Sequence, residues 1–480
     1  MTSRSRWLSL IVLCAGMLMI ILDQNIVNVA LRSIQQDLGF TPAGLAWVVN
    51  AYGIPFGGLL LLSGRLGDLL GRKRIFLSGL ALFTAASLLC GLAWTPGLLI
   101  AARLVQGIGG ALTAAVVLGM IVTLFQEPRE RAKAIGVFSF VGSAGASIGI
   151  LAGGVLTQFA NWHWIFFVNL PIGLLIGVAG VRLLDRESGL GLPAGADVAG
   201  GALVTGGLML GGYAISEATA DGWASVRVIV LGIVAVALLA GFVLRQARAA
   251  APLLRLRILA NPVVWASNLV QALWASALFG FQFLRAIYLQ QVLHYGPVET
   301  GLAFLPTTIA IGTLSLGFSA RLTTRFGAQR VLLAGLALVG VALALMAWGP
   351  EGGAYVTDVL PSMVLLGVGA GMTLPSTTTI AMSAATPADS GLVSGLLNTT
   401  LQVGGALGLA VLVSLAAART SGIDPSAQPS AAALVSGYQL AFGIGAGLVL
   451  AAVVVTAVVL TRRPAPTATT GSVATAGAAR

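Results

Sequence analysis

The sequence predicts an all-α integral membrane protein with fourteen transmembrane helices, grouped as six helices, two linking helices and six more. Composition, the length of the apolar segments and an internal repeat predict this class. Of the 480 residues, 57% are hydrophobic and only 9% are charged, and the mean hydropathy is +0.97. Soluble proteins carry about 25% charged residues, so this chain has too few to cover its surface in water. Lipid must therefore surround most of it.

Apolar segments long enough to cross about 30 Å of hydrocarbon follow one another along the chain. They lack the short alternating pattern of a membrane β-barrel, so each is expected to be a helix. The fourteen spans are expected at residues 7–31, 43–63, 75–94, 97–125, 135–157, 163–184, 197–216, 225–245, 262–290, 300–320, 330–349, 357–383, 391–417 and 436–461. The tail after Arg463 is rich in Pro, Ala, Thr and Gly, and we expect it to be disordered.

The distribution of basic residues predicts the orientation in the membrane. With the N-terminus in the cytoplasm, 21 of the 26 Lys and Arg residues fall in internal segments, and three fall in external ones, namely Arg32, Arg227 and Arg419. This positive-inside bias predicts that both termini are cytoplasmic. Since the basic residues form short clusters between apolar segments, the net charge of +11 indicates loops beside anionic lipid, not a nucleic-acid partner. Only two of the 26 are lysines, which is typical of a GC-rich bacterial genome, so a bacterial cytoplasmic membrane is expected.

An internal repeat predicts two related halves. Residues 63–82 (SGRLGDLLGRKRIFLSGLAL) and 319–338 (SARLTTRFGAQRVLLAGLAL) are identical at ten of twenty positions. The offset of 256 residues places the loop after the second helix onto the same loop of a second half. We therefore expect a six-helix bundle at 1–190, two linking helices at 191–258, a second bundle at 259–463 and a cytoplasmic tail at 464–480. In transporters built this way the substrate binds between the halves.

Four motifs carry a resemblance to a known family. They are a first-helix signature over residues 22–31 (LDQNIVNVAL), a fourth-helix motif over 103–107 (RLVQG), a loop motif of Gly64, Asp68, Gly71, Arg72 and Lys73, and a fifth-helix motif of Gly136, Gly145, Gly149, Gly153 and Gly154. With these motifs the chain resembles the fourteen-helix drug:proton antiporters of the major facilitator superfamily over nearly its whole length. The resemblance implies the major facilitator fold and a multidrug or antibiotic exporter, with no enzyme activity, cofactor or metal.

Asp23 and Arg103 are charges deep within apolar segments, where an unpaired charge costs several kcal/mol. If the first helix runs outward to about Ala30 and the fourth runs inward from about Gly97, Asp23 lies about 10 Å and Arg103 about 9 Å below the outer surface. The first and fourth helices are neighbours in the resembled fold. We therefore predict a proton-coupling salt bridge between them that breaks when Asp23 takes up a proton. A permanent structural ion pair is the alternative.

The loop motif is expected at the cytoplasmic surface, where its charges are tolerated. Its glycines permit a tight turn, and Asp68, Arg72 and Lys73 are expected to act as a conformational latch on the helix ends. A merely solvated basic loop is the alternative. In the second-half copy Thr324 replaces Asp68, so a weaker latch is expected there.

Further polar residues within the expected helices are candidates for a substrate cavity, namely Asn25, Gln106, Arg285 and Asn398. For Arg285 the alternative is that its guanidinium reaches the membrane interface. If Asp23, Arg103 and Arg285 all face the cavity, its formal charge is +1. Neutral or anionic lipophilic substrates are then favoured over permanent dications, which need buried negative charge. His163, in a short external turn, is expected to be structural.

The favoured function is export of lipophilic small molecules, driven by the proton-motive force. The protein is expected to be a monomer, with its substrate, protons and membrane lipid as its partners. Uptake or uniport of a small metabolite by the same fold is the alternative, because Ile150 stands where the resembled antiporters have a proline that kinks the fifth helix. A membrane enzyme or channel is disfavoured. The sequence has no nucleotide-binding loop, metal-ligand cluster or acidic pore ring.

Overall fold

The computed structural model describes residues 3–460, apart from 186–188, 190, 192–195, 223, 250–251, 350–353, 386–389 and 426–428, and within α6 it leaves the surroundings of several residues undescribed. Every regular element in this part of the chain is a helix. The tail 464–480, for which we expect disorder, lies outside the described residues.

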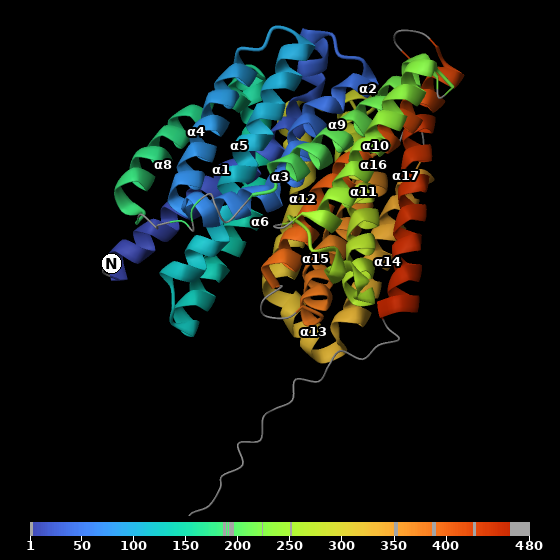
Figure 1. The fold of residues 1–480 in the computed structure, drawn as a ribbon. Coiled ribbons are helices and arrows are strands. Elements are labelled where there is room, and N and C mark those ends of the chain that lie inside the picture. Colours follow the sequence, from blue (N-terminus) through green and yellow to red (C-terminus); the bar gives the residue numbers. More distant parts are fainter. Residues whose placement is uncertain are drawn as a thin grey trace, which may run out of the picture.

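The helices fall into a first half, a linking pair and a second half (Figure 1). The first half contains α1 (Ser3–Leu38), α2 (Pro42–Leu45), α3 (Trp47–Leu70), α4 (Arg72–Gly91), α5 (Pro96–Leu124), α6 (Pro128–Phe159), α7 (Trp164–Phe167) and α8 (Asn169–Leu183). The linking pair is α9 (Val198–Asp221) and α10 (Val226–Arg248). The second half contains η2 (Leu256–Ala260), α11 (Pro262–Gln291), α12 (Pro297–Thr313), η3 (Leu314–Phe318), α13 (Ser319–Phe326), α14 (Ala328–Ala347), η4 (Tyr355–Val359), α15 (Leu360–Ser383), α16 (Ser390–Ile423), α17 (Ala431–Val455) and η5 (Thr456–Leu460).

Twelve helices within the described residues are long and apolar enough to cross a membrane. Their number is two below the fourteen spans expected from the sequence. The two expected spans that are not among them lie in α6, where Ile148–Phe159 forms a shorter apolar helix, and in the stretch from α12 to α13. The chain is thus an all-helical, multi-pass membrane protein.

The repeat seen in the sequence recurs in the backbone. Helices α4 and α14 both have 20 residues, and their bounds differ by 256 at each end. Each follows a glycine with a positive φ, 96° at Gly71 and 84° at Gly327, a conformation that residues with a Cβ rarely adopt. The packing repeats as well, since Gly79 lies against Thr113 of α5 and Gly335 lies against Thr373 of α15.

The two halves lie side by side and meet most closely at one end of the bundle. We call the end that holds Gly71 and Gly327 the inner end, and the end where α1 stops at Leu38 the outer end. In Figure 1 the ribbons of the halves converge at the outer end and diverge towards the inner end. Hydrogen bonds join α1 to α11 at the outer end: Gln290 bonds Val29 and Arg32, and Gln291 donates to Gln35. This arrangement closes the outer end.

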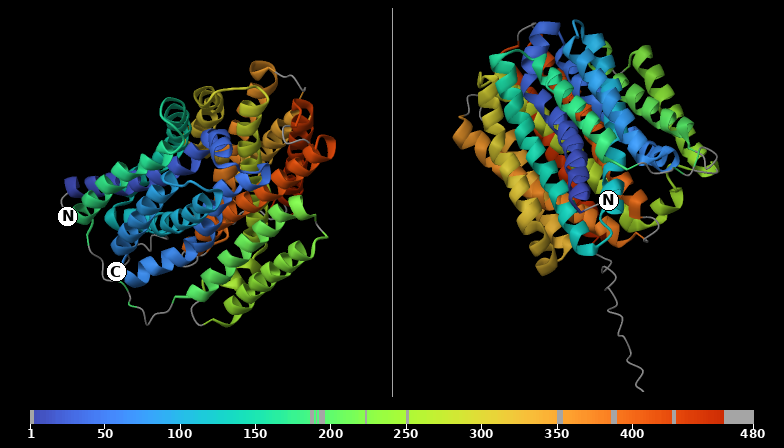
Figure 2. Two further views of the ribbon diagram at one scale, coloured as in Figure 1. Left: turned by 90° about the horizontal axis from the view of Figure 1, so that it is seen from above. Right: turned by 90° about the vertical axis from the view of Figure 1, so that its left-hand side faces the viewer.

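The linking helices cover one seam between the halves. Helix α9 packs against α3 of the first half, where Gly58 faces Thr205, and against α16 of the second half, where Ser414 donates to the Ile215 carbonyl. Helix α10 packs on the far side of α9, and Figure 2 shows the pair along one edge of the molecule. Most of the α10 side chains therefore face lipid.

A buried polar clamp holds the linking pair together at its inner end. Asp197 caps α9 by accepting from Gly200 N–H, and it also accepts hydrogen bonds from Arg245 and Gln246 of α10. Burial alone would raise the pKa of Asp197, but these hydrogen bonds hold that pKa below its usual range. Gln246 also accepts from the backbone N–H of Leu254, which ties the clamp to the segment entering the second half.

The clamp gives a pH-dependent prediction. Asp197→Asn removes the charge and replaces one of two accepting oxygens by an amide nitrogen, so the wild type should be more stable at pH 7, by about 1–2 kcal/mol, of which the partly exposed Arg245 pair contributes at most about 1 kcal/mol. A carboxyl whose folded pKa is lowered contributes stability above its unfolded pKa near 4, and this is lost as the pH falls through the folded value. Thermal unfolding in detergent should show the same difference at pH 7 and pH 5 and a smaller one below pH 4. Equal melting temperatures at pH 7 would show that the charge does not stabilise the clamp.

Candidate functional site

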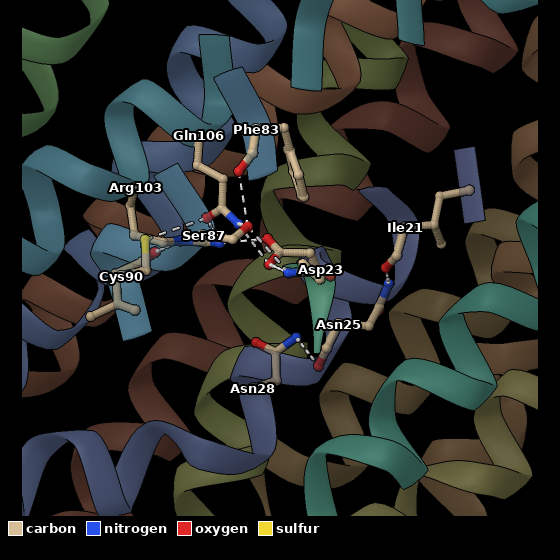
Figure 3. A network of polar contacts seen from close by, with 11 residues as sticks. Ile21, Asp23, Asn25, Asn28, Phe83, Ser87, Cys90, Arg103 and Gln106 are labelled. Carbon is tan, nitrogen blue, oxygen red and sulfur yellow. Dashed lines mark hydrogen bonds and ion pairs between the residues drawn. The ribbon is translucent and has the colours of Figure 1, made fainter. Parts of the chain in front are cut away.

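Asp23 lies at the centre of a fully buried hydrogen-bond network in the first half (Figure 3). Its Oδ2 accepts from Arg103 Nη1 of α5 over 2.6 Å. Its Oδ1 accepts from Gln106 Nε2 of α5 and from Asn169 Nδ2 of α8, each over 2.8 Å. Ser87 Oγ of α4 accepts a further bond from Gln106. Three helices, α4, α5 and α8, thus supply the groups around a carboxylate on α1.

Arg103 is held as firmly as its partner. Its Nε donates to the Val48 carbonyl of α3 over 2.9 Å, and its Nη1 also donates to Gln106 Oε1 over 2.7 Å. The guanidinium carbon lies 4.4 Å from the centre of the Tyr52 ring and 5.7 Å from that of Phe166. Aromatic faces attract cations, so these rings stabilise the charge where water is excluded.

Glycines bring α5 close enough to place this network. A Cβ at Gly107 would collide with the Tyr52 carbonyl of α3, and one at Gly109 would collide with the Phe83 backbone of α4. Only glycine therefore allows α5 to approach both helices at these heights. The close approach carries Arg103 and Gln106 inward to the carboxylate.

The arrangement around Asp23 matches a deprotonated carboxylate. Three donors face its two oxygens, from Arg103, Gln106 and Asn169. A carboxylate has about four lone-pair sites and three are occupied here, so the site left for a proton is on Oδ2, beside the Arg103 guanidinium. Loss of the negative charge also leaves the buried guanidinium without its counter-ion. The charge of Asp23 therefore bears directly on the contacts that join α1, α5 and α8.

The structure brings Asp23 and Arg103 together as the sequence predicts, but the depth estimate behind that prediction was wrong in one respect. Helix α1 does not end near Ala30; it continues to Leu38. Polar residues continue this helix because they bond across to α11, as Arg32 and Gln35 do. The end of the helix therefore does not mark the membrane surface.

Sequence reasoning missed three members of the network. Asn169 begins an Asn-Leu-Pro segment five residues after Trp164, and this polar residue at the start of an apolar segment was the available signal. Ser87 and Cys90 lie three residues apart on α4, so they share a face; Cys90 Sγ lies 3.6 Å from Gln106 Oε1. Small polar residues are common in membrane helices, so nothing in the sequence singled these out.

The glycines of the fifth-helix motif lie on α6, where they face neighbouring helices. Gly145, Gly149 and Gly153 face α1, where added Cβ atoms would meet the side chain of Ile21 and the carbonyls of Leu22 and Ile26. Gly154 faces the backbone of α12 in the other half. Helix α6 runs from Pro128 to Phe159 without interruption through Ile150, which is buried and contacts Gly301 of α12. The surroundings of Gly136 lie outside the described part of the chain.

The loop motif makes its contacts within the first half. Arg72 pairs with Asp68 one turn away over 3.1 Å and also donates to the Gly119 carbonyl of α5. Lys73 donates to the Val181 carbonyl of α8 over 2.8 Å. Gly64 makes no close contact, because an added Cβ there would meet nothing within 4 Å. In the second half Thr324 bonds its own helix, at the Arg321 carbonyl. The loop motif thus connects α3, α4, α5 and α8.

Of the four residues expected to line a cavity, Gln106 and Arg285 are fully buried and so do not line an open one, which corrects that part of the prediction. Gln106 is fully buried in the Asp23 network. Arg285 is also fully buried: it donates to Ser362 Oγ over 2.7 Å and to the Val359 carbonyl, so it neither lines an open cavity nor reaches the interface. Asn25 donates to the Ile21 carbonyl of its own helix, and Asn398 is exposed on α16. Gln106 bonds the side chains of the Asp23 network, whereas Arg285 and Asn25 bond the nearest backbone or hydroxyl oxygen.

The second half has apolar side chains where the network is polar. The offset between α4 and α14 places Leu343 and Met346 at the positions of Ser87 and Cys90. Thr113 of α5 and Thr373 of α15 make equivalent contacts with Gly79 and Gly335, so the offset between α5 and α15 is 260 residues. With this offset, Met363 and Leu366 of α15 correspond to Arg103 and Gln106 of α5. These four residues are buried in the core. The buried charge pair is thus a feature of one half.

The two related helical bundles meet at the outer end of the molecule. This architecture is that of a multi-pass membrane transporter, in which one half moves against the other. Comparison with known proteins identifies its family. The family model of the Major Facilitator Superfamily matches residues 13–409. The chain belongs to the major facilitator superfamily, which makes it a transporter and not an enzyme.

Relatives and solved structures agree with this assignment. The puromycin resistance protein pur8 of Streptomyces alboniger is 38% identical over 473 residues, which cover 97% of this chain and 94% of that protein. The cephamycin export protein CmcT of Amycolatopsis lactamdurans is 35% identical over 455 residues, covering 94% and 92%. A crystal structure of the peptide transporter POT has a TM-score of 0.68 at 16% identity and covers 94% of both chains, which shows a shared fold.

The charge network gives a prediction about stability. Arg103→Ala leaves a buried carboxylate without its counter-ion and should cost about 3–5 kcal/mol. The double variant with Asp23→Asn should recover much of that loss, because the uncompensated charge is gone. Thermal stability of the two single variants and the double variant in detergent forms a double-mutant cycle. Additive effects would contradict a direct interaction between the two side chains.

Proposed function

We propose that this chain is a drug:proton antiporter that exports lipophilic small molecules, antibiotics among them, across a bacterial cytoplasmic membrane by alternating access. The observation that supports the proposal is the buried Asp23–Arg103 pair, because a proton on Asp23 would remove the counter-ion of a buried guanidinium and so favour a different arrangement of the helices around it. The relatives named above are a resistance protein and an export protein, which supports export as the direction.

The closed outer end fits one step of such a cycle. With the outer end sealed by contacts between α1 and α11, substrate is expected to reach the protein from the inner side. The carboxylate is then surrounded by donors, as expected after its proton has left to the cytoplasm. Substrate bound in this state and a proton bound in the outward-facing state would exclude each other, which is the condition for antiport.

The orientation and the number of spans belong to the same proposal. Basic residues concentrated at the inner end support cytoplasmic termini. Exposed aromatic rings at the outer end, at Trp94, Phe159 and Trp348, support a membrane interface there. We propose fourteen spans, with α6 and the α12–α13 stretch crossing beside their neighbours, and the division into 1–190, 191–258 and 259–463 in a monomer.

We further assign two roles. Asp23 and Arg103 are proposed as the proton-coupling pair, with Gln106 and Asn169 positioning the carboxylate. The loop motif around Asp68 and Arg72 is proposed as the latch that holds α3, α4 and α5 in register at the inner end, supported by the Arg72 contact to Gly119.

The test of coupling uses inside-out vesicles and a pH-sensitive dye, with a substrate first found by a drug-susceptibility panel in an efflux-deficient bacterial host. Asp23→Asn should abolish substrate-driven proton movement, because the amide cannot exchange a proton. Asp358→Asn makes the same chemical change at an exposed outer turn and should behave as the wild type.

Two results would overturn the proposal in different ways. If Asp23→Asn exports at the wild-type rate with unchanged pH dependence, Asp23 is not the coupling acid. If the wild type moves substrate without moving protons, the chain is a uniporter, the alternative that Ile150 leaves open.

The substrate's charge gives a separate prediction. Among the described residues Asp23 is the carboxylate buried within the transmembrane helices, and Arg103 already neutralises it. A permanent dication would find no free counter-ion there and would keep its desolvation cost. We therefore expect a larger fold-increase in resistance to neutral or anionic lipophilic compounds than to dicationic quaternary ammonium antiseptics. A panel in which the dications show the largest increase would contradict this.

A further inference from the structure

A cluster of titratable and aromatic residues at the outer end is not used by the proposed cycle. Asp37, in the last turn of α1, faces Trp162 and His163 in the turn before α7. Trp162 Nε1 donates to Asp37 Oδ2 over 2.9 Å, and His163 Nε2 lies 3.7 Å from the same oxygen. The indole and imidazole rings stack with their centroids 3.8 Å apart.

The contacts of the imidazole identify the nitrogen that is open to a proton. Nδ1 of His163 lies 2.9 Å from the Gly91 carbonyl at the end of α4. A carbonyl oxygen only accepts, so Nδ1 carries the hydrogen of the neutral ring and Nε2 has the free lone pair. A proton from the outer solution forms an N–H bond at Nε2 and releases nothing. The resulting imidazolium has one N–H towards a carbonyl and the other towards a carboxylate.

Few charges other than Asp37 act on this imidazole. Helix α7 packs against α1, α4, α6 and α8. The charged residues of α4, α6 and α8 lie at the inner end, in the segments Arg72–Arg74 and Arg129–Lys133 and at Arg182. Helix α1 contributes Arg32 and Asp37 at the outer end, and Arg32 bonds the Gln290 carbonyl of the other half. Asp37 is thus the charged group placed to respond to protonation of His163.

Protonation of His163 acts on the part of α1 whose hydrogen bonds to α11 close the outer end. Asp37 is two residues beyond Gln35 and five beyond Arg32, and both of these bond α11. An imidazolium that attracts Asp37 fixes the end of α1 to the α6–α7 turn and to the end of α4. The attraction holds the last turns of α1 in the position from which Arg32 and Gln35 bond α11, and it thereby favours the closed arrangement.

We propose that His163 and Asp37 form a second proton-binding site, separate from the Asp23 network, whose occupation at acidic external pH holds the outer end closed. Imidazole is the side chain whose charge ordinarily changes between pH 5 and 8. Its bearing on transport rests on the proposed function, but binding of the proton and closure of the outer end can be measured without any substrate.

Proton binding is tested by tryptophan emission of the purified protein. A protonated imidazole quenches a stacked indole more than a neutral one does, so acid should quench Trp162 in the wild type. His163→Gln should lose this acid-dependent component, and His163→Arg should show no pH dependence of it. His294→Gln, which changes the other of the two histidines, should titrate as the wild type does. At pH 6, Asp37→Asn should show weaker quenching. Full quenching in His163→Gln would overturn the proposal.

Closure is tested by the distance between spin labels on the two halves. Gln36→Cys and Leu302→Cys are exposed positions at the outer ends of α1 and α12, and the native Cys14 and Cys90 are buried. Between pH 8 and pH 5.5 the wild type should shift towards the shorter distance. His163→Arg should show the shorter distance at both values, and His163→Gln should show no shift. The same shift in all three proteins would overturn the proposed closure, whatever the transport assays show.

Discussion

The structure depends on keeping one carboxylate and one guanidinium neutral as a pair inside hydrocarbon. Neither Asp23 nor Arg103 has access to water, so each remaining donor and acceptor must be satisfied by the protein. That requirement accounts for the polar residues at matching depth on α4, α5 and α8, and for the glycines that let α5 approach α3 and α4. Removing one member leaves another unsatisfied, so the four helices behave as a unit.

Alternating access adds a second constraint, since the unit must move without coming apart. The contacts between the halves are of a different kind from the network: a pair of glutamines on α11 bonds the outer end of α1, and glycines of α6 and α12 bring two backbones together. Such contacts expose few unsatisfied groups when they separate at the membrane surface. The polar network stays within one half, while the interface between the halves opens and closes.

Much of the fold could be predicted from the sequence, because the length of the apolar segments and the repeat at an offset of 256 are direct consequences of spanning lipid twice by the same plan. The pairing of Asp23 with Arg103 was also predictable, since a deep charge needs a partner. The roles of Asn169, Ser87 and Cys90 were not, because small polar residues are common in such helices. Arg285 shows another limit: a backbone carbonyl and one serine hydroxyl hold it, and a sequence does not show which carbonyl will face a guanidinium.

The neutrality of the Asp23–Arg103 pair has an electrical consequence. A proton added to a pair of zero net charge leaves one positive charge within the low-dielectric part of the first half, and the apolar residues at the corresponding places of the second half do not balance it. Moving one elementary charge across a membrane is worth about 2.3 kcal/mol per 100 mV. The proposed exchange of a neutral drug for one proton moves one net charge, so the membrane voltage would drive it alongside the pH gradient. Such a transporter continues to work when the pH inside and outside the cell is equal, as long as the membrane remains polarised.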